Sequence, residues 1–153
     1  MHPDEWKARV ELAAAYRVFD MLGWAEMIYN HITVRLPDSV SGREKQFLIN
    51  PFGLHYSEVT ASNLLKIDVQ GNKLDADNPW PVNPAGFTIH AAIHEAVPDA
   101  HCVTHSHTTS GLAVACWKNT PPPCGPGTRA PSPTRVAWSG CAMKPEPMSA
   151  ETP

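Results

Sequence analysis

Apolar positions in the first 116 residues follow a helical period in one segment and a strand-like pattern in others. Residues 4–22 predict an amphipathic helix, capped by Asp4 and ended by Gly23. Residues 31–36 and 65–69 alternate apolar with polar side chains, and residues 47–49 form a short apolar run, so all three predict strands. The apolar side of the first helix is defined by Trp6, Val10, Ala13, Ala14, Val18 and Met21.

Beyond these strands, the pattern predicts a further helix and strand separated by loops. Residues 78–84 contain three prolines and predict a loop, and residues 85–96 then predict a helix. Residues 100–104 predict a short buried strand, and Ser110 is placed to cap another helix. This order of elements predicts an α/β or α+β fold with a central sheet.

The pattern is lost after residue 118. Nine of the 16 prolines follow that position, and neither a period of 2 nor one of 3.6 returns. Such a composition cannot bury a core, so we expect a domain over residues 5–116 and a Pro-rich disordered tail over 117–153.

Charge and composition exclude several classes of partner. The net charge of −3 gives no reason to expect nucleic acid or an anionic membrane as partner. The apolar runs are too short for a membrane span, and charged residues near the N-terminus argue against a signal peptide, so we expect a cytoplasmic protein. The four cysteines lack CxxC spacing and are expected to be free thiols.

Candidate chemistry is concentrated in four histidines between residues 84 and 107. His105 and His107 lie two residues apart at a strand end, so both side chains leave on the same side and present two imidazoles to one metal ion. His90 and His94 lie four apart on one helix face, where they are ligands, second-shell partners or simply a polar surface.

The remaining histidines of interest carry weaker signals. His101 precedes the buried strand and is expected to be exposed, whereas His31 and His55 have no partner that the sequence reveals. The alternative for His105 and His107 is a His-x-His pair without metal, because that spacing alone is a weak signal.

Three separated segments together resemble the class II aldolase/adducin family. They are NHITVR, FLINPFGLHYSEVTASNLLKIDVQGN and NPAGFTIHAAIHEAVPDAHCVTHSH, and the similarity extends over residues 8–116. The resemblance implies an α/β/α sandwich around a mostly antiparallel central sheet, incomplete here. It also implies a homo-oligomer, usually a tetramer, with active sites between subunits.

The same resemblance implies a metal-dependent reaction on a small oxygenated substrate. Family enzymes hold a divalent ion, zinc most readily and iron as the alternative, with three histidines; His105 and His107 match two of them. The ion stabilises the negative charge that develops beside a carbonyl during lyase, epimerase or decarboxylase chemistry. By position, Asn30 and Gly53 match substrate-binding residues.

The sequence departs from the sugar-phosphate aldolases at several of the positions that matter for catalysis. Gly86 stands where those enzymes carry the acid/base glutamate, while Pro84, Ala85 and Phe52 replace side chains that bind phosphate. The Gly-Asn pair before the first strand is replaced by Asn30-His31. The chain therefore resembles the adducin-like branch, and its catalytic residues are unknown.

Three hypotheses for function follow from these observations. The first is a metal-dependent carbon–carbon lyase-like enzyme, impaired here and not a sugar-phosphate aldolase. The second is a non-catalytic adducin-like binding or scaffold module. The third is a non-functional fragment, because residues 117–153 contain no histidine to serve as the third ligand and their abrupt onset suggests a frameshift rather than a natural terminus.

Overall fold

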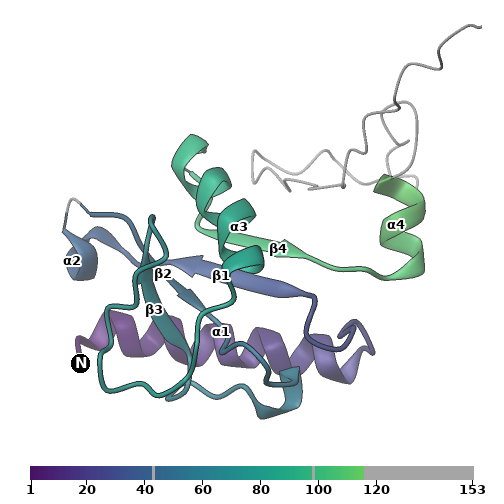
Figure 1. Cartoon of the computed structure of the whole chain (residues 1–153), viewed down its shortest axis with the longest axis horizontal. Helices are drawn as coiled ribbons and strands as arrows, with labels where there is room; N and C mark the ends of the chain where they lie inside the picture. The colour runs from purple at the N-terminus through teal and green to yellow at the C-terminus, as the bar shows by residue number, and fades with distance from the viewer. Residues whose placement is uncertain (43, 98, 116–153) are drawn as a thin grey trace, which may run out of the picture.

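The computed structural model describes residues 1–42, 44–97 and 99–115, and these form a layered α/β body (Figure 1). The predicted tail lies outside the described residues, so it and the domain boundary stay predictions. The elements, in chain order, are α1 (Pro3–Met21), β1 (His31–Arg35), α2 (Asp38–Ser41), β2 (Gln46–Ile49), η1 (Tyr56–Glu58), β3 (Leu65–Asp68), α3 (Pro84–Ala96), β4 (Cys102–His105) and α4 (Thr109–Ala115).

The four strands form one sheet in the order β3-β2-β1-β4, and each neighbouring pair is antiparallel. Helix α1 lies along one face of the sheet and α3 along the other (Figure 1). The predicted α/β fold with an antiparallel central sheet is confirmed. All four predicted strands form, with bounds shifted by at most two residues.

The α1 side of the sheet holds the larger apolar core. Leu12 and Tyr16 of α1 pack there with Ile32 of β1 and Leu48 of β2, and all four are almost fully buried. The Tyr16 hydroxyl donates to the carbonyl of Ile32 at 2.5 Å, which satisfies the one polar group this ring brings inside. The 3-10 helix η1 adds Tyr56, whose ring meets Tyr16 edge-on.

The predicted apolar side of α1 is wrong. Trp6, Val10, Val18 and Met21 are between 47% and 84% exposed, whereas the buried side chains of the helix are Glu5, Ala8, Arg9, Leu12 and Tyr16. The error arose because two charged residues lie on the buried face and apolar residues lie on both faces. Arg9 is buried because its guanidinium bonds the Glu5 carboxylate and the carbonyl of Leu64.

Two predicted helix caps are also corrected. Helix α1 begins at Pro3 with the His2 side chain accepting from the amide of Asp4, so His2 and not Asp4 is the N-cap. In α4 the hydroxyl of Thr108, not of Ser110, accepts from the amide of Gly111. Gly23 has a φ of +67° just after α1, as expected for a residue that ends a helix.

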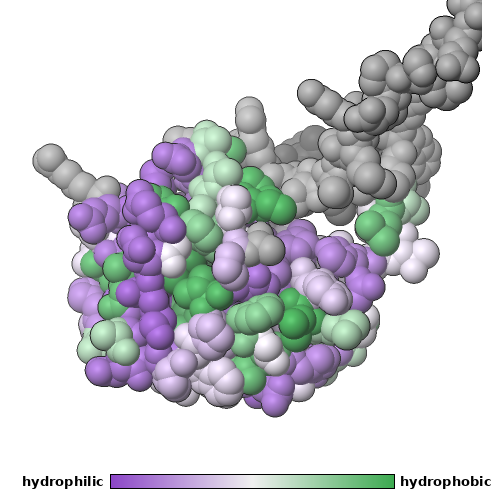
Figure 2. Space-filling view, viewed as in Figure 1, coloured by the Kyte–Doolittle hydropathy of each residue, from purple (hydrophilic) through white to green (hydrophobic). Residues whose placement is uncertain are grey.

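The surface of this body is mixed in character. On the face shown in Figure 2, hydrophobic and hydrophilic patches alternate over the described part of the chain. No helix among residues 1–42, 44–97 and 99–115 is long and apolar enough to cross a membrane. Cys102, the cysteine that the structure describes, is a free thiol, as predicted; the other three lie outside the described residues.

Candidate metal centre

The α3 side of the sheet collects histidines from three elements. His31 and His105 are directly opposite each other in the β1–β4 register, and antiparallel partners present their side chains on one face. His90 and His94, one helical turn apart on α3, reach down to the same face and are almost fully buried. They are therefore not a polar surface, and packing against the sheet explains their spacing.

The imidazole rings form a close cluster. The centroid of the His105 ring lies 5.1 Å from that of His90, 5.3 Å from that of His31 and 5.4 Å from that of His107. The structure thus brings the two predicted ligands, His105 and His107, side by side. Whether they bind one ion stays a prediction.

A hydroxyl on β1 links the two histidines of α3. Thr33 Oγ1 lies 2.8 Å from Nδ1 of His90 and 2.9 Å from Nε2 of His94. The other nitrogen of His94, Nδ1, lies 2.8 Å from the carbonyl oxygen of Ala100, to which it donates. Phe47 stacks on the His94 ring with a centroid distance of 4.5 Å and fixes its plane.

The series continues through His105 to the loop before β1. His90 Nε2 lies 2.9 Å from His105 Nδ1, and His105 Nε2 lies 3.0 Å from the carbonyl oxygen of Tyr29. Five contacts thus join two carbonyls through three imidazoles and one hydroxyl. This series is named the histidine relay, and its members in order are Tyr29, His105, His90, Thr33, His94 and Ala100.

His107 contacts a carboxylate and is not a member of the histidine relay. Its Nδ1 lies 3.0 Å from Oε2 of Glu26, which comes from the loop between α1 and β1. A carboxylate on one imidazole nitrogen leaves the other, Nε2, for a ligand, and this is the usual arrangement behind metal-binding histidines. Both predicted ligands therefore have Nδ1 engaged within the protein.

Burial keeps His31, His90 and His94 uncharged near neutral pH. It lowers the pKa of His90 to about 3 and those of His31 and His94 to about 4. Neighbouring imidazoles push the pKa of His90 and of His31 further in the same direction. The pKa of His105 is lowered as well, by burial first and then by His107. Neutral imidazole is the form that binds metal ions.

His31 and Gly86 form a steric pair. A Cβ added at Gly86 would lie 2.5 Å from Cδ2 and 2.6 Å from Cε1 of the His31 ring, with Nε2 closer still. Asn83 fixes that ring by donating from Nδ2 to His31 Nε2 at 2.8 Å. The His31 ring thus fills the space that a side chain at position 86 would need, so the two positions are sterically linked.

The residues matched to substrate binding do not join this cluster through any contact among the described residues. Asn30 is almost fully buried, and its Nδ2 donates to the carbonyl of Trp24 at 2.6 Å while its Oδ1 lacks a partner among them. Gly53 is exposed in the loop after β2 with a φ of +94°. Their predicted role stays a prediction. His101 is exposed, as expected.

The donor set fits a divalent metal in kind but is short of a third ligand. Two imidazoles with Nδ1 engaged are typical ligands for zinc or iron. Among the described residues, no group of three or more His, Cys, Asp or Glu side chains is arranged to hold an ion. The chain as described therefore offers His105 and His107 and no third protein ligand.

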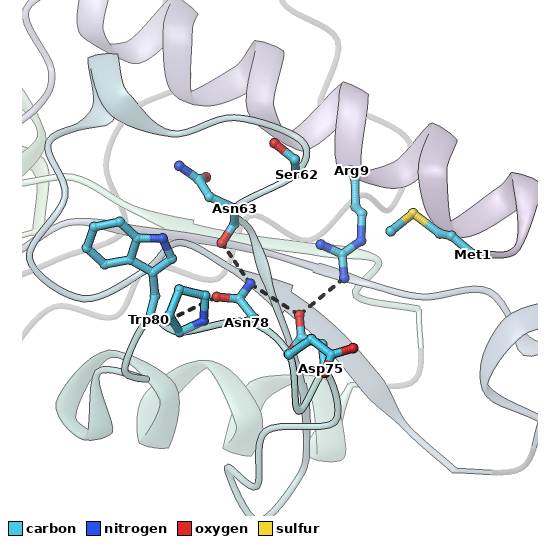
Figure 3. A pocket seen from close by; sticks show the side chains of 9 residues that line it. Met1, Arg9, Ser62, Asn63, Asp75, Asn78 and Trp80 are labelled. Atoms are coloured by element: carbon cyan, nitrogen blue, oxygen red, sulfur yellow. Dashed lines mark hydrogen bonds and ion pairs between the residues drawn. The ribbon is translucent and has the colours of Figure 1, made fainter.

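A cavity of about 320 Å³ elsewhere on the molecule is a weaker candidate (Figure 3). Arg9 and Asp75 line it, but the guanidinium of Arg9 already bonds Glu5, Asp75 and the carbonyl of Leu64. Burial raises the pKa of Glu5, yet hydrogen bonds from Lys66 and Arg9 outweigh it and lower the pKa overall. These charges satisfy one another, and the network joins α1 to β3, so neither Arg9 nor Asp75 is left for a ligand.

Sequence reasoning missed several members of the site. His31 lacks a visible partner because its neighbour His105 is 74 positions later and meets it only through the sheet register. Thr33 and Glu26 are common residues with no distinguishing spacing. One signal was available for His31: by the family resemblance, both His31 and Gly86 depart from the pattern expected of the sugar-phosphate aldolases.

Comparison with known proteins shows to which family the chain is similar. The model of the class II aldolase and adducin N-terminal domain matches residues 10–143. The chain is 49% identical over 114 residues to a candidate class 2 aldolase of Pseudomonas aeruginosa, covering 74% of the chain and 42% of that protein. It is 51% identical over 111 residues to alpha-adducin of Rattus norvegicus, covering 72% of the chain and 15% of that protein.

Solved structures agree with this assignment. An aldolase II superfamily protein from Pseudomonas syringae matches with a TM-score of 0.70 and 45% identity, covering 77% of the chain and 46% of that structure. L-fuculose 1-phosphate aldolase from Glaciozyma antarctica matches with a TM-score of 0.64 and 34% identity, covering 72% of the chain and 44% of that structure. The chain spans less than half the length of these relatives. It belongs to the class II aldolase/adducin family.

Proposed function

We propose that this chain binds a divalent metal ion through Nε2 of His105 and Nε2 of His107, and that the ion is zinc, with iron as the alternative. The adjacency of the two rings, with each Nδ1 already engaged inside the protein, carries the proposal. When bound, such an ion would supply a Lewis acid for charge beside a carbonyl. With two protein ligands in the described part, binding is weak.

The test is a Zn²⁺ titration of the full 153-residue chain, followed by the NMR signals of its histidine side chains. Signals of His105 and His107 shift together at one affinity. His107→Ala lowers that affinity at least about tenfold, because one of two ligands is lost. His101→Ala, an exposed histidine outside the cluster, leaves it unchanged. Absence of saturable binding, or equal affinity in His107→Ala, contradicts the proposal.

The reaction we propose for this protein, if it is active, is metal-dependent lyase-like chemistry on a small oxygenated substrate, but not cleavage of sugar phosphates. Gly86 carries no proton donor, and the His31 ring fills the adjoining space. General acid/base catalysis is typically worth about a hundred- to ten-thousand-fold. We expect no cleavage of L-fuculose 1-phosphate above background, with a family aldolase as the positive control; clear turnover by this chain contradicts that expectation.

A second function is an adducin-like binding module without catalysis. The steric link between His31 and Gly86 favours it, as does the similarity to alpha-adducin. Zinc binding without turnover of any small oxygenated substrate supports this alternative. We further propose a cytoplasmic homo-oligomer, a tetramer by family resemblance, without nucleic-acid or membrane partners; sedimentation of the purified chain tests the assembly.

A further inference from the structure

The histidine relay has more contacts than hydrogens. Its five contacts need five hydrogens, but three neutral imidazoles and one hydroxyl supply four. One contact must therefore bring two lone pairs together. Where this mismatch falls decides which nitrogen of His105 carries the proton.

One order starts at Ala100. The carbonyl of Ala100 can only accept, so in this order His94 Nδ1 carries a hydrogen and His94 Nε2 accepts from the Thr33 hydroxyl. Thr33 then accepts from His90 Nδ1, and His90 Nε2 accepts from Nδ1 of His105. In this order four hydrogens satisfy four contacts, and the mismatch falls between His105 Nε2 and Tyr29 O.

The opposite order starts at Tyr29. His105 Nε2 then donates to that carbonyl, and the mismatch falls at one of the other four contacts: between His105 and His90, on either side of Thr33, or at Ala100. Thr33, His90 and His94 are at most 1% exposed, so no water can relieve a mismatch at Thr33. The contacts between His105 and His90 and at Ala100 are partly buried, whereas the contact between His105 Nε2 and the Tyr29 carbonyl is exposed, so water satisfies that carbonyl most readily. The order that starts at Ala100 is therefore favoured.

We propose that His90, Thr33 and His94 are positioning residues that hold His105 in the tautomer protonated at Nδ1, so that its Nε2 presents a lone pair to a metal ion. Only the identity of that ligand as a metal rests on the proposed function. The tautomer itself is a property of the metal-free chain. His107 reaches the same state by a different route, through the Glu26 carboxylate.

The direct test is the tautomer of each histidine in the metal-free, full 153-residue chain. Two-bond proton–nitrogen correlation spectra, recorded above the ordinary histidine pKa of about 6.5, distinguish a protonated from an unprotonated ring nitrogen. We expect Nδ1 to be protonated in His94, His90 and His105. Protonation of His105 at Nε2 would mean that it donates to the Tyr29 carbonyl and would overturn the proposal, whichever nitrogen of His90 is protonated.

Variants at Thr33 test whether the histidine relay determines the tautomer of His105. Thr33→Val removes the hydroxyl but keeps the branched shape, so His105 loses its fixed tautomer and Zn²⁺ affinity falls about tenfold, as for other partners of ligating histidines. Thr33→Ser restores both, because it restores the hydroxyl. Thr104→Val, on an exposed threonine of β4, is the matched control and changes neither.

The outcomes separate the relay from the metal proposal. If the wild-type chain binds no Zn²⁺, the proposed function fails, and the metal-free spectrum alone decides the relay. If Thr33→Val does not fold, that spectrum again decides. If Thr33→Val folds and keeps both the wild-type tautomer of His105 and the wild-type affinity, the relay does not position His105 and the proposal is wrong.

Discussion

The two faces of the sheet are built from the same strands but filled with different chemistry. On the α1 face, Leu12, Tyr16 and Leu48 pack in a mainly apolar core, in which the Tyr16 hydroxyl donates to the carbonyl of Ile32. On the α3 face, the β1 and β4 half carries His31, Thr33 and His105 beneath two buried histidines of the helix. Burial on the first face removes apolar surface from water. On the second it removes polar groups from water, which is favourable only if they bond one another.

Because of this difference, the two faces of one domain respond differently to substitution. An apolar face tolerates many residues of about the right volume, whereas a buried polar series works only if each hydrogen has an acceptor. The α3 face therefore depends on histidine protonation and on single atoms in a way that the apolar core on the α1 face does not. The following experiments test that difference between the two faces.

Acidification should have the largest effect. The pKa values of His31, His94 and His90 are lowered to about 4, 4 and 3, below the ordinary value of about 6.5. Between these limits the unfolded chain binds more protons than the folded one, so stability is full above about pH 6.5 and is lost as pH falls toward about 4. Each histidine contributes a slope of up to about 1.4 kcal/mol per pH unit.

Urea unfolding at a series of pH values measures this slope. We expect the His31→Asn variant to lose less stability on acidification than the wild-type chain, because one of the buried histidines is gone. His101→Gln, an exposed position, serves as the control. An unfolding midpoint that stays constant from neutral pH down to about pH 5 would show that the α3 face is not the acid-sensitive one.

Truncation of the apolar face comes next. Leu12 is 1% exposed, and Leu12→Ala should lower the unfolding free energy by about 2–5 kcal/mol through lost burial and a residual cavity. Val18→Ala on the same helix, at a side chain 50% exposed, should change it by less than about 0.5 kcal/mol. Similar losses in the two variants would contradict the corrected orientation of α1.

Most of the fold could be predicted from sequence, and the site only in part. Strands β1 and β3 were predictable because alternation reports which side of a strand is buried. The buried side of α1 could not be predicted. Arg9 is buried through bonds that include one to the carbonyl of Leu64, which lies 55 positions away in the sequence. Similarly, His105 and His107 were visible as a local pair, whereas His31 reaches them only through the register of β1 and β4.

Gly86 tests the steric link within the polar face. Gly86→Ala should destabilise by about 1–3 kcal/mol, because the new Cβ overlaps the His31 ring. In a His31→Ala background the same change should be nearly neutral, so a double-mutant cycle should give a coupling energy of at least about 1 kcal/mol. Additive effects would mean that positions 31 and 86 are not sterically linked.

The smallest effect on stability is expected at Glu26, which supports His107 from a position 54% exposed. An exposed ion pair contributes about 0–1 kcal/mol, so Glu26→Gln should shift the unfolding midpoint by little. Zn²⁺ affinity should nevertheless fall, by up to about tenfold, because the amide holds Nδ1–H of His107 less strongly than the carboxylate does. Glu58→Gln, another exposed acidic residue away from the cluster, is the matched control. Unchanged affinity in Glu26→Gln would mean that His107 does not depend on its carboxylate partner, and the parallel between His107 and His105 would be lost.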